Sequence, residues 1–102
     1  MEELYKSIHS EETDSFFDAV LSLKTREECY RFFEDICTIK ELLAIAQRME
    51  VARLLDEGMT FSVIAEKTGA STATIARVNK CIRYGAGGYQ LVLETLHKKN
   101  ED

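Results

Sequence analysis

The residues of this sequence best suited to binding chemistry are cations that have no acidic neighbours along the chain. Between Lys67 and Leu93 there is no Asp or Glu, whereas Lys67, Arg77, Lys80 and Arg83 all fall in this segment. Guanidinium and ammonium groups bind phosphates, and an arginine also presents paired donors to guanine. The whole chain has a net charge of −5, which argues against a general polyanion binder. Attraction for nucleic acid is therefore expected to be local to this segment.

Residues 60–84 contain two short helical patterns joined by a glycine turn, which is typical of a helix-turn-helix. Thr60 can cap the first helix, which should end at Gly69, and Ser71 can cap the second. The second helix divides into an apolar row and an opposite row that would face a DNA groove. The rows are Ile75, Val78 and Ile82, and Ala73, Arg77, Lys80 and Tyr84. The same residues would also suit an ordinary solvated helix pair.

Composition and periodicity predict an all-α fold of about six helices. The chain has 102 residues, 30% of them charged, and no proline, and this length suits one domain. Capping residues Thr25 and Thr38, each followed by Glu three positions later, should open two helices, and Gly58 should end the longer one. We expect a flexible N-terminus over residues 1–12 and a single helical domain over residues 13–97.

The apolar faces predict more buried surface than so small a chain can provide by itself. The second helix should bury Cys29, Phe32, Phe33 and Ile36. The long helix that follows has an apolar stripe wider than a surface helix needs. A second copy of the chain would cover this surface, so we expect a homodimer. A compact monomer is the alternative.

The remaining residues provide no catalytic or metal-binding motif. Cys29, Cys37 and Cys81 match no metal or redox spacing, His9 and His97 lie near opposite ends, and we interpret the cysteines as small core residues. There is no nucleophile elbow or phosphate-binding loop, so we expect neither an enzyme nor a cofactor. No segment has the pattern of a signal peptide or a membrane span, which predicts a cytoplasmic protein without membrane contact.

The order of these elements and the string GASTATIARV resemble the tryptophan repressor superfamily. SLKTREECYRFFEDICTIKELLAIAQRMEVARLL and TGASTATIARVNKCIRYG resemble its YerC/YecD group, across roughly residues 13–97. Members of the superfamily are all-helical, intertwined homodimers that place two helix-turn-helix units on operator DNA. The resemblance therefore implies a sequence-specific, double-stranded DNA-binding transcriptional regulator of the repressor type.

Carried over by position, the resemblance places the start of the recognition helix at Ser71, Thr72, Ala73 and Thr74. These short side chains would let the backbone approach the major groove, with hydroxyls for phosphates or base edges. Arg77 matches an arginine that lines the corepressor pocket of the repressor and also faces DNA. Lys80 and Arg83 complete the set of expected contacts.

Two departures concern the corepressor pocket, whose positions here are Gln47, Arg77 and Val78. Val78 stands where the repressor has a glycine that leaves room for the indole ring. Gln47 stands where the repressor has a second arginine, so one cation that would flank the bound amino acid is missing. We expect no response to tryptophan, and the sequence identifies no other effector.

A helical protein-protein interaction module that keeps the fold without binding DNA specifically is the alternative function. Its binding surface would be acidic residues of the first two helices, which are more often simply solvated. These residues are Glu11, Glu12, Asp14, Asp18, Glu27, Glu28, Glu34 and Asp35.

Overall fold

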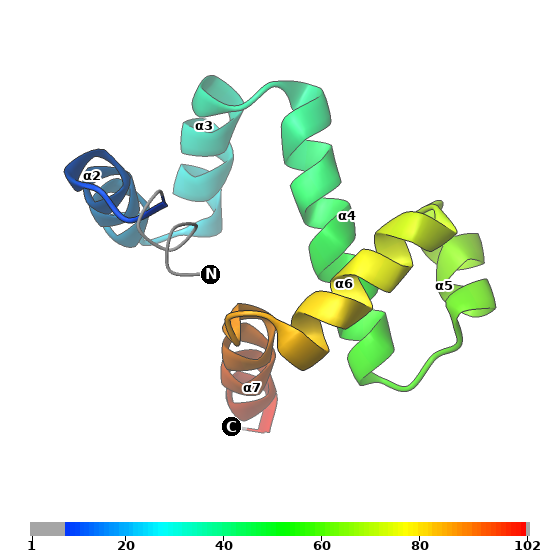
Figure 1. Ribbon diagram of the computed structural model, residues 1–102. Helices are drawn as coiled ribbons and strands as arrows, with labels where there is room; N and C mark the ends of the chain where they lie inside the picture. Colours follow the sequence, from blue (N-terminus) through cyan, green and yellow to red (C-terminus); the bar gives the residue numbers. More distant parts are fainter. Residues whose placement is uncertain (1–7, 102) are drawn as a thin grey trace. The chain divides into compact units, whose positions relative to one another are not determined.

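The computed structural model describes residues 8–101, which form six α-helices and no strand (Figure 1). The helices are α2 (Glu11–Leu21), α3 (Arg26–Ile36), α4 (Ile39–Asp56), α5 (Phe61–Thr68), α6 (Thr72–Tyr84) and α7 (Gly88–Glu101). The predicted all-α class is confirmed. Most of the N-terminal segment that the sequence predicts to be flexible, residues 1–7, lies outside the described residues. The chain divides into two compact units, one ending at Ile39 and the other beginning at Lys40.

The first unit contains α2 and α3, whose starts are fixed by side-chain caps. The Ser10 hydroxyl accepts the backbone N–H of Thr13 at 3.1 Å, and the Thr25 hydroxyl accepts that of Glu28 at 3.1 Å. The Glu28 carboxylate in turn accepts the backbone N–H of Lys24 at 2.9 Å. The capping box predicted at Thr25 is therefore present, with its return bond one residue before the cap.

The apolar face predicted for α3 is only partly covered among residues 8–101, and its coverage by a second copy of the chain stays a prediction. No residue of α2 or α3 is buried. Phe32 stacks on Phe16 with ring centroids 6.1 Å apart, whereas Ile36 is 51% exposed. The pair of 11-residue helices shares one aromatic seam, which leaves their other apolar side chains in contact with solvent.

The interpretation of the cysteines as small core residues is wrong, because none of the three is buried. Cys29 and Cys81 are exposed and Cys37 is half-buried, and all three are free thiols. Cys29 and Cys81 lie on exposed faces of α3 and α6, and Cys37 lies at the C-terminal end of α3.

The second unit contains α4 to α7 and holds the hydrophobic core. Side chains of α4, α5 and α6, with one residue of the turn between α5 and α6, are at most 5% exposed. They are Val51, Ala52, Leu54, Ile64, Ala70, Ile75 and Val78. α5 and α6 therefore pack against the C-terminal half of α4 (Figure 1). Burial of these core side chains sets the position of the helix-turn-helix against α4.

Gly58 and Gly69 end α4 and α5, as the sequence predicts. At Gly58, φ is +85° and the Met59 N–H bonds to the Leu54 carbonyl at 3.1 Å, as in a Schellman cap. α7 continues to Glu101, beyond residue 97, where the sequence predicts the helical domain to end. Lys98 and Lys99 lie in its last turn, where cations interact favourably with the helix dipole.

The junction between α6 and α7 requires glycine at one position. A Cβ on Gly85 would lie 2.3 Å from the carbonyl oxygen of Cys81, the atom to which the Gly85 N–H donates at 2.8 Å. We expect Gly85→Ala to lower the free energy of unfolding by roughly 1–3 kcal/mol. Urea denaturation at a fixed protein concentration measures this change.

Gly88→Ala is the matched control, because a Cβ on Gly88 has no atom within 4 Å. Gly88 is the first residue of α7. Alanine there should leave the stability unchanged or raise it by up to about 1 kcal/mol. Equal effects of the two substitutions would contradict this explanation of the junction.

Candidate nucleic-acid interface

The helix-turn-helix consists of α5, a three-residue turn and α6. The Thr60 hydroxyl accepts a backbone N–H at the start of α5 at 3.3 Å. At Gly69, φ is +75°, and its N–H donates to the Ala65 carbonyl at 2.9 Å. The Ser71 hydroxyl accepts the N–H of Thr74 at 3.1 Å and so caps α6. All three predicted helix boundaries are confirmed.

The two rows of α6 have opposite environments. Ile75 is 0% exposed and Val78 is 1% exposed, and both belong to the core. Ile82 is partly buried against the same core. The opposite row, comprising Ala73, Arg77, Lys80 and Tyr84, is exposed. Because the buried row is fixed against α4 and α5, the basic row must face away from the core.

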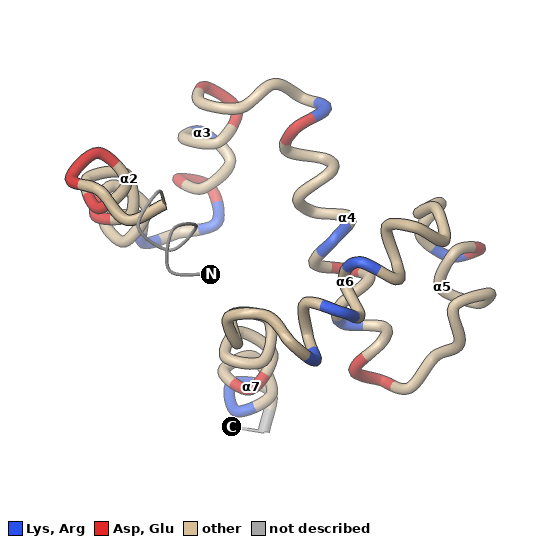
Figure 2. Tube along the Cα trace, viewed as in Figure 1, with Lys and Arg blue, Asp and Glu red and all other residues tan. Residues whose placement is uncertain are grey.

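The cations of α6 have no acidic partner among residues 8–101. Arg77, Lys80 and Arg83 are exposed, and none forms an ion pair within that range. Figure 2 shows basic positions along α6 and no acidic one. The charge of these three side chains is therefore free to attract an anionic ligand.

Arg53 on α4 is different, because two carboxylates already surround its guanidinium group. Its Nε donates to Glu50 at 2.7 Å, and its other nitrogens bond Glu50 and Glu57. The hydrogen bond to Arg53 lowers the pKa of Glu50 below its usual value. Arg53 thus adds little to the positive surface of the unit.

The hydroxyl residues expected to contact DNA gather on the first turn of α6. Ser71 and Thr74 are bonded to each other through their side-chain oxygens at 3.0 Å, and the Ser71 oxygen also caps the helix. Thr72 and Ala73 are exposed beside them. The structure therefore brings all four short residues to the end of α6 nearest the turn.

The three predicted pocket positions have three different environments. Gln47 is half-buried, and its side-chain Nε2 donates to the carbonyl oxygen of Thr68 at 3.2 Å. Val78 is in the core, and Arg77 is at the surface. Gln47 and Val78 are thus both engaged in contacts of the folded chain.

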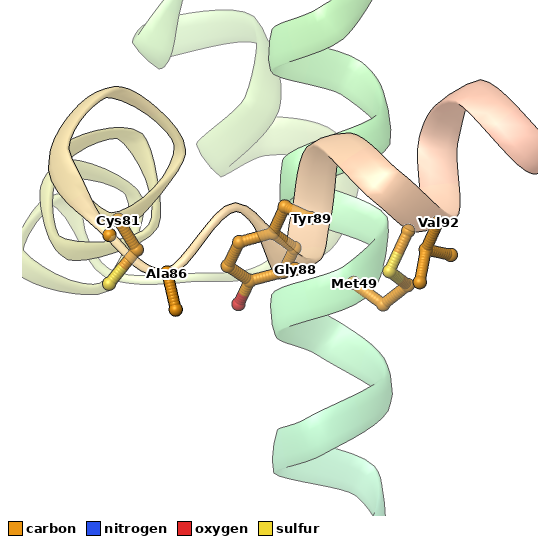
Figure 3. A pocket seen from close by; sticks show the side chains of 7 residues that line it. Met49, Cys81, Ala86, Gly88, Tyr89 and Val92 are labelled. Atoms are coloured by element: carbon orange, nitrogen blue, oxygen red, sulfur yellow. The ribbon is translucent and has the colours of Figure 1, made fainter. Parts of the chain in front are cut away.

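Sequence reasoning missed a cavity of about 470 Å³ between α4, α6 and α7 (Figure 3). Met49 and Val92 lie on one side of it and Cys81 and Ala86 on the other, with Tyr89 between them. Gly85 and Gly88 complete its lining. The glycines at positions 85, 87 and 88 indicate a break between two helices, but their spacing does not predict a cavity.

The part of the chain that the structure describes contains no group of three or more His, Cys, Asp or Glu residues that could hold a metal ion. Among the same residues, no helix is both long enough and apolar enough to cross a membrane.

Comparisons with known proteins agree on one family. The family model described as Trp repressor protein matches residues 11–97. The uncharacterized protein YerC of Bacillus subtilis (strain 168) is 53% identical over 87 residues, which cover 85% of this chain and 84% of YerC.

Two crystal structures have the same fold. A TrpR-like protein from Eubacterium eligens ATCC 27750 matches with a TM-score of 0.88 and 51% identity, covering 90% of this chain and 95% of that chain. A candidate Trp repressor from Staphylococcus aureus matches with a TM-score of 0.87 and 39% identity, covering 90% and 92% respectively.

Proposed function

The chain belongs to the Trp repressor protein family and to its YerC-related group, and on this premise we propose that it is a sequence-specific DNA-binding regulator that acts as a homodimer. The observation that carries the proposal is the outward row of α6. Three cations without acidic partners in residues 8–101 stand on a helix whose opposite row is buried. Such a helix can enter a major groove, with its N-terminal residues contacting bases.

The distribution of charge supports local binding by an acidic protein. Residues 1–39 contain ten Asp and Glu against four Lys and Arg, whereas residues 40–102 contain eight against nine. The unit that holds α6 therefore lacks the negative excess of the chain. Repulsion between the acidic first unit and DNA phosphates would weaken non-specific DNA binding. It would weaken specific docking through one basic helix less.

We assign distinct roles to the residues of α6. Arg77, Lys80 and Arg83 bind phosphates or guanine edges, and the hydroxyls of Ser71, Thr72 and Thr74 set the register on the backbone. Ala73 leaves room for close approach. The description of the matching family supports a repressor rather than an activator.

Exposed apolar side chains support the homodimer. Leu43 on α4 is 63% exposed and Leu91 on α7 is 66% exposed, and no residue of α2 or α3 is buried. Large apolar side chains left in water on several helices are typical of a subunit interface. Two copies would present two α6 helices about 34–36 Å apart, one turn of the DNA duplex.

Replacing the cations of α6 tests the DNA interface. In a gel shift with the genomic fragment that the protein binds most tightly, Arg77→Ala should weaken binding by about 1–3 kcal/mol if Arg77 contacts a guanine. Lys80→Ala should reduce the slope of log affinity against log salt concentration by about one. Lys99→Ala, on α7, removes the same charge and should leave affinity unchanged. Equal, weak binding to all fragments, or indifference to both α6 substitutions, would favour the interaction module instead.

Introducing a charge into the exposed apolar surface tests the homodimer. We expect Leu43→Asp to shift sedimentation equilibrium from dimer to monomer, because a carboxylate there would be desolvated without a partner. Asp18→Asn, on the acidic surface of α2, should leave the dimer intact. A wild-type protein that sediments as a single subunit would refute this part of the proposal.

We further propose that tryptophan is not the effector. Val78 fills core space, and the Gln47 amide supplies no positive charge for a carboxylate. Isothermal titration calorimetry with tryptophan should show no saturable heat. Saturable binding in the micromolar range would show that the pocket is retained.

A further inference from the structure

Gln47 is a polar residue on the face of α4 that packs against the helix-turn-helix. Val51 and Leu54 follow it at the fourth and seventh positions, so the three side chains lie on one side of the helix. Val51 is 0% exposed and Leu54 is 3% exposed. Gln47 thus extends an apolar contact surface with a hydrogen-bonding group.

The Gln47 amide meets α5 at an atom that the helix itself leaves without a partner. Thr68 is the last residue of α5, and the final carbonyls of a helix have no partner within it. The Thr68 carbonyl accepts from Gln47 Nε2 at 3.2 Å. The Thr68 hydroxyl donates to the Ile64 carbonyl at 2.7 Å and accepts the Ala70 N–H at 3.1 Å. Thr68 therefore connects α4, the end of α5 and the turn before α6.

Apolar contacts and hydrogen bonds restrain the helix-turn-helix differently. Burial of the seam between α4, α5 and α6 is favourable but has little directional preference. A hydrogen bond weakens steeply when its angle departs from linear, so it fixes the register of one element on another. The hydrogen bond from Gln47 is made to Thr68, four residues before the first residue of α6. α6 is the helix that carries the exposed cations.

We propose that Gln47 is a positioning residue of the DNA interface, holding the end of α5 against α4 so that α6 keeps its docking orientation without a bound small molecule. This inference rests on the proposed DNA-binding function. A neutral amide suits the position, because the C-terminal end of α5 is the negative pole of its helix dipole and would repel a carboxylate.

The test compares two glutamines that make the same kind of bond. Gln47→Met keeps the length of the side chain and removes its donor. Gln90→Met is the matched control, since Gln90 Nε2 also donates to a backbone carbonyl at 3.2 Å, that of Ile82 near the other end of α6. Gel-shift affinity for the tightest genomic fragment and amide hydrogen exchange of residues 69–71 are measured for both variants.

We expect Gln47→Met to weaken DNA binding roughly 3- to 10-fold, from the usual net value of one hydrogen bond, and to speed exchange of the turn amides. Gln90→Met should change neither. Gln47→Glu, nearly identical in shape, should weaken binding at least as much. Wild-type protein refolded from denaturant, and so stripped of small molecules, should bind DNA without any addition.

Equal effects of the two methionine substitutions on affinity and exchange would overturn the inference. Stripped wild-type protein that recovers DNA binding only after small molecules are restored would overturn it too. Failure of the proposed function would give a different result, because wild-type protein would then bind no DNA fragment specifically under any condition. Hydrogen exchange of residues 69–71 would still report whether Gln47 positions the turn.

Discussion

Burial of one apolar seam is the constraint on which the arrangement of the second unit depends. Ile64 and Ile75 are fully shielded from water, and Val51 of α4 is shielded with them. α6 buries one row in this core and leaves the opposite row exposed, so packing of Ile75 places Arg77 and Lys80 at the surface. The basic face of α6 is therefore a consequence of the core rather than an independent feature.

Local hydrogen bonds and backbone conformation then set the ends of the helices that the core positions. The Ser71 cap and the positive φ of Gly69 set where α6 begins, and the Gln47 amide donates a hydrogen bond to the last residue of α5. Residues 1–39 hold ten of the Asp and Glu residues against four Lys and Arg, so the negative excess of the chain comes from the first unit and not from the unit that holds α6. An acidic protein can in this way present a basic helix to a polyanion.

Features fixed by neighbouring residues could be predicted from the sequence, and features that depend on distant ones could not. The ends of α5 and α6 follow from Thr60, Gly69 and Ser71, which act within one helical turn. The bond between Gln47 and Thr68 spans 21 residues, and the cavity beside Tyr89 joins three helices. Apolar periodicity predicted a buried face for α3, but periodicity does not say whether the covering surface comes from the same chain.

The most direct test of the central claim is in vitro selection of DNA from a random pool with the full-length protein. If two copies of α6 read successive major grooves, the pool should become enriched in a near-palindrome whose half-sites are separated by about ten base pairs. Recovery of sequences with no shared motif after repeated rounds would contradict the claim that this helix recognises DNA specifically.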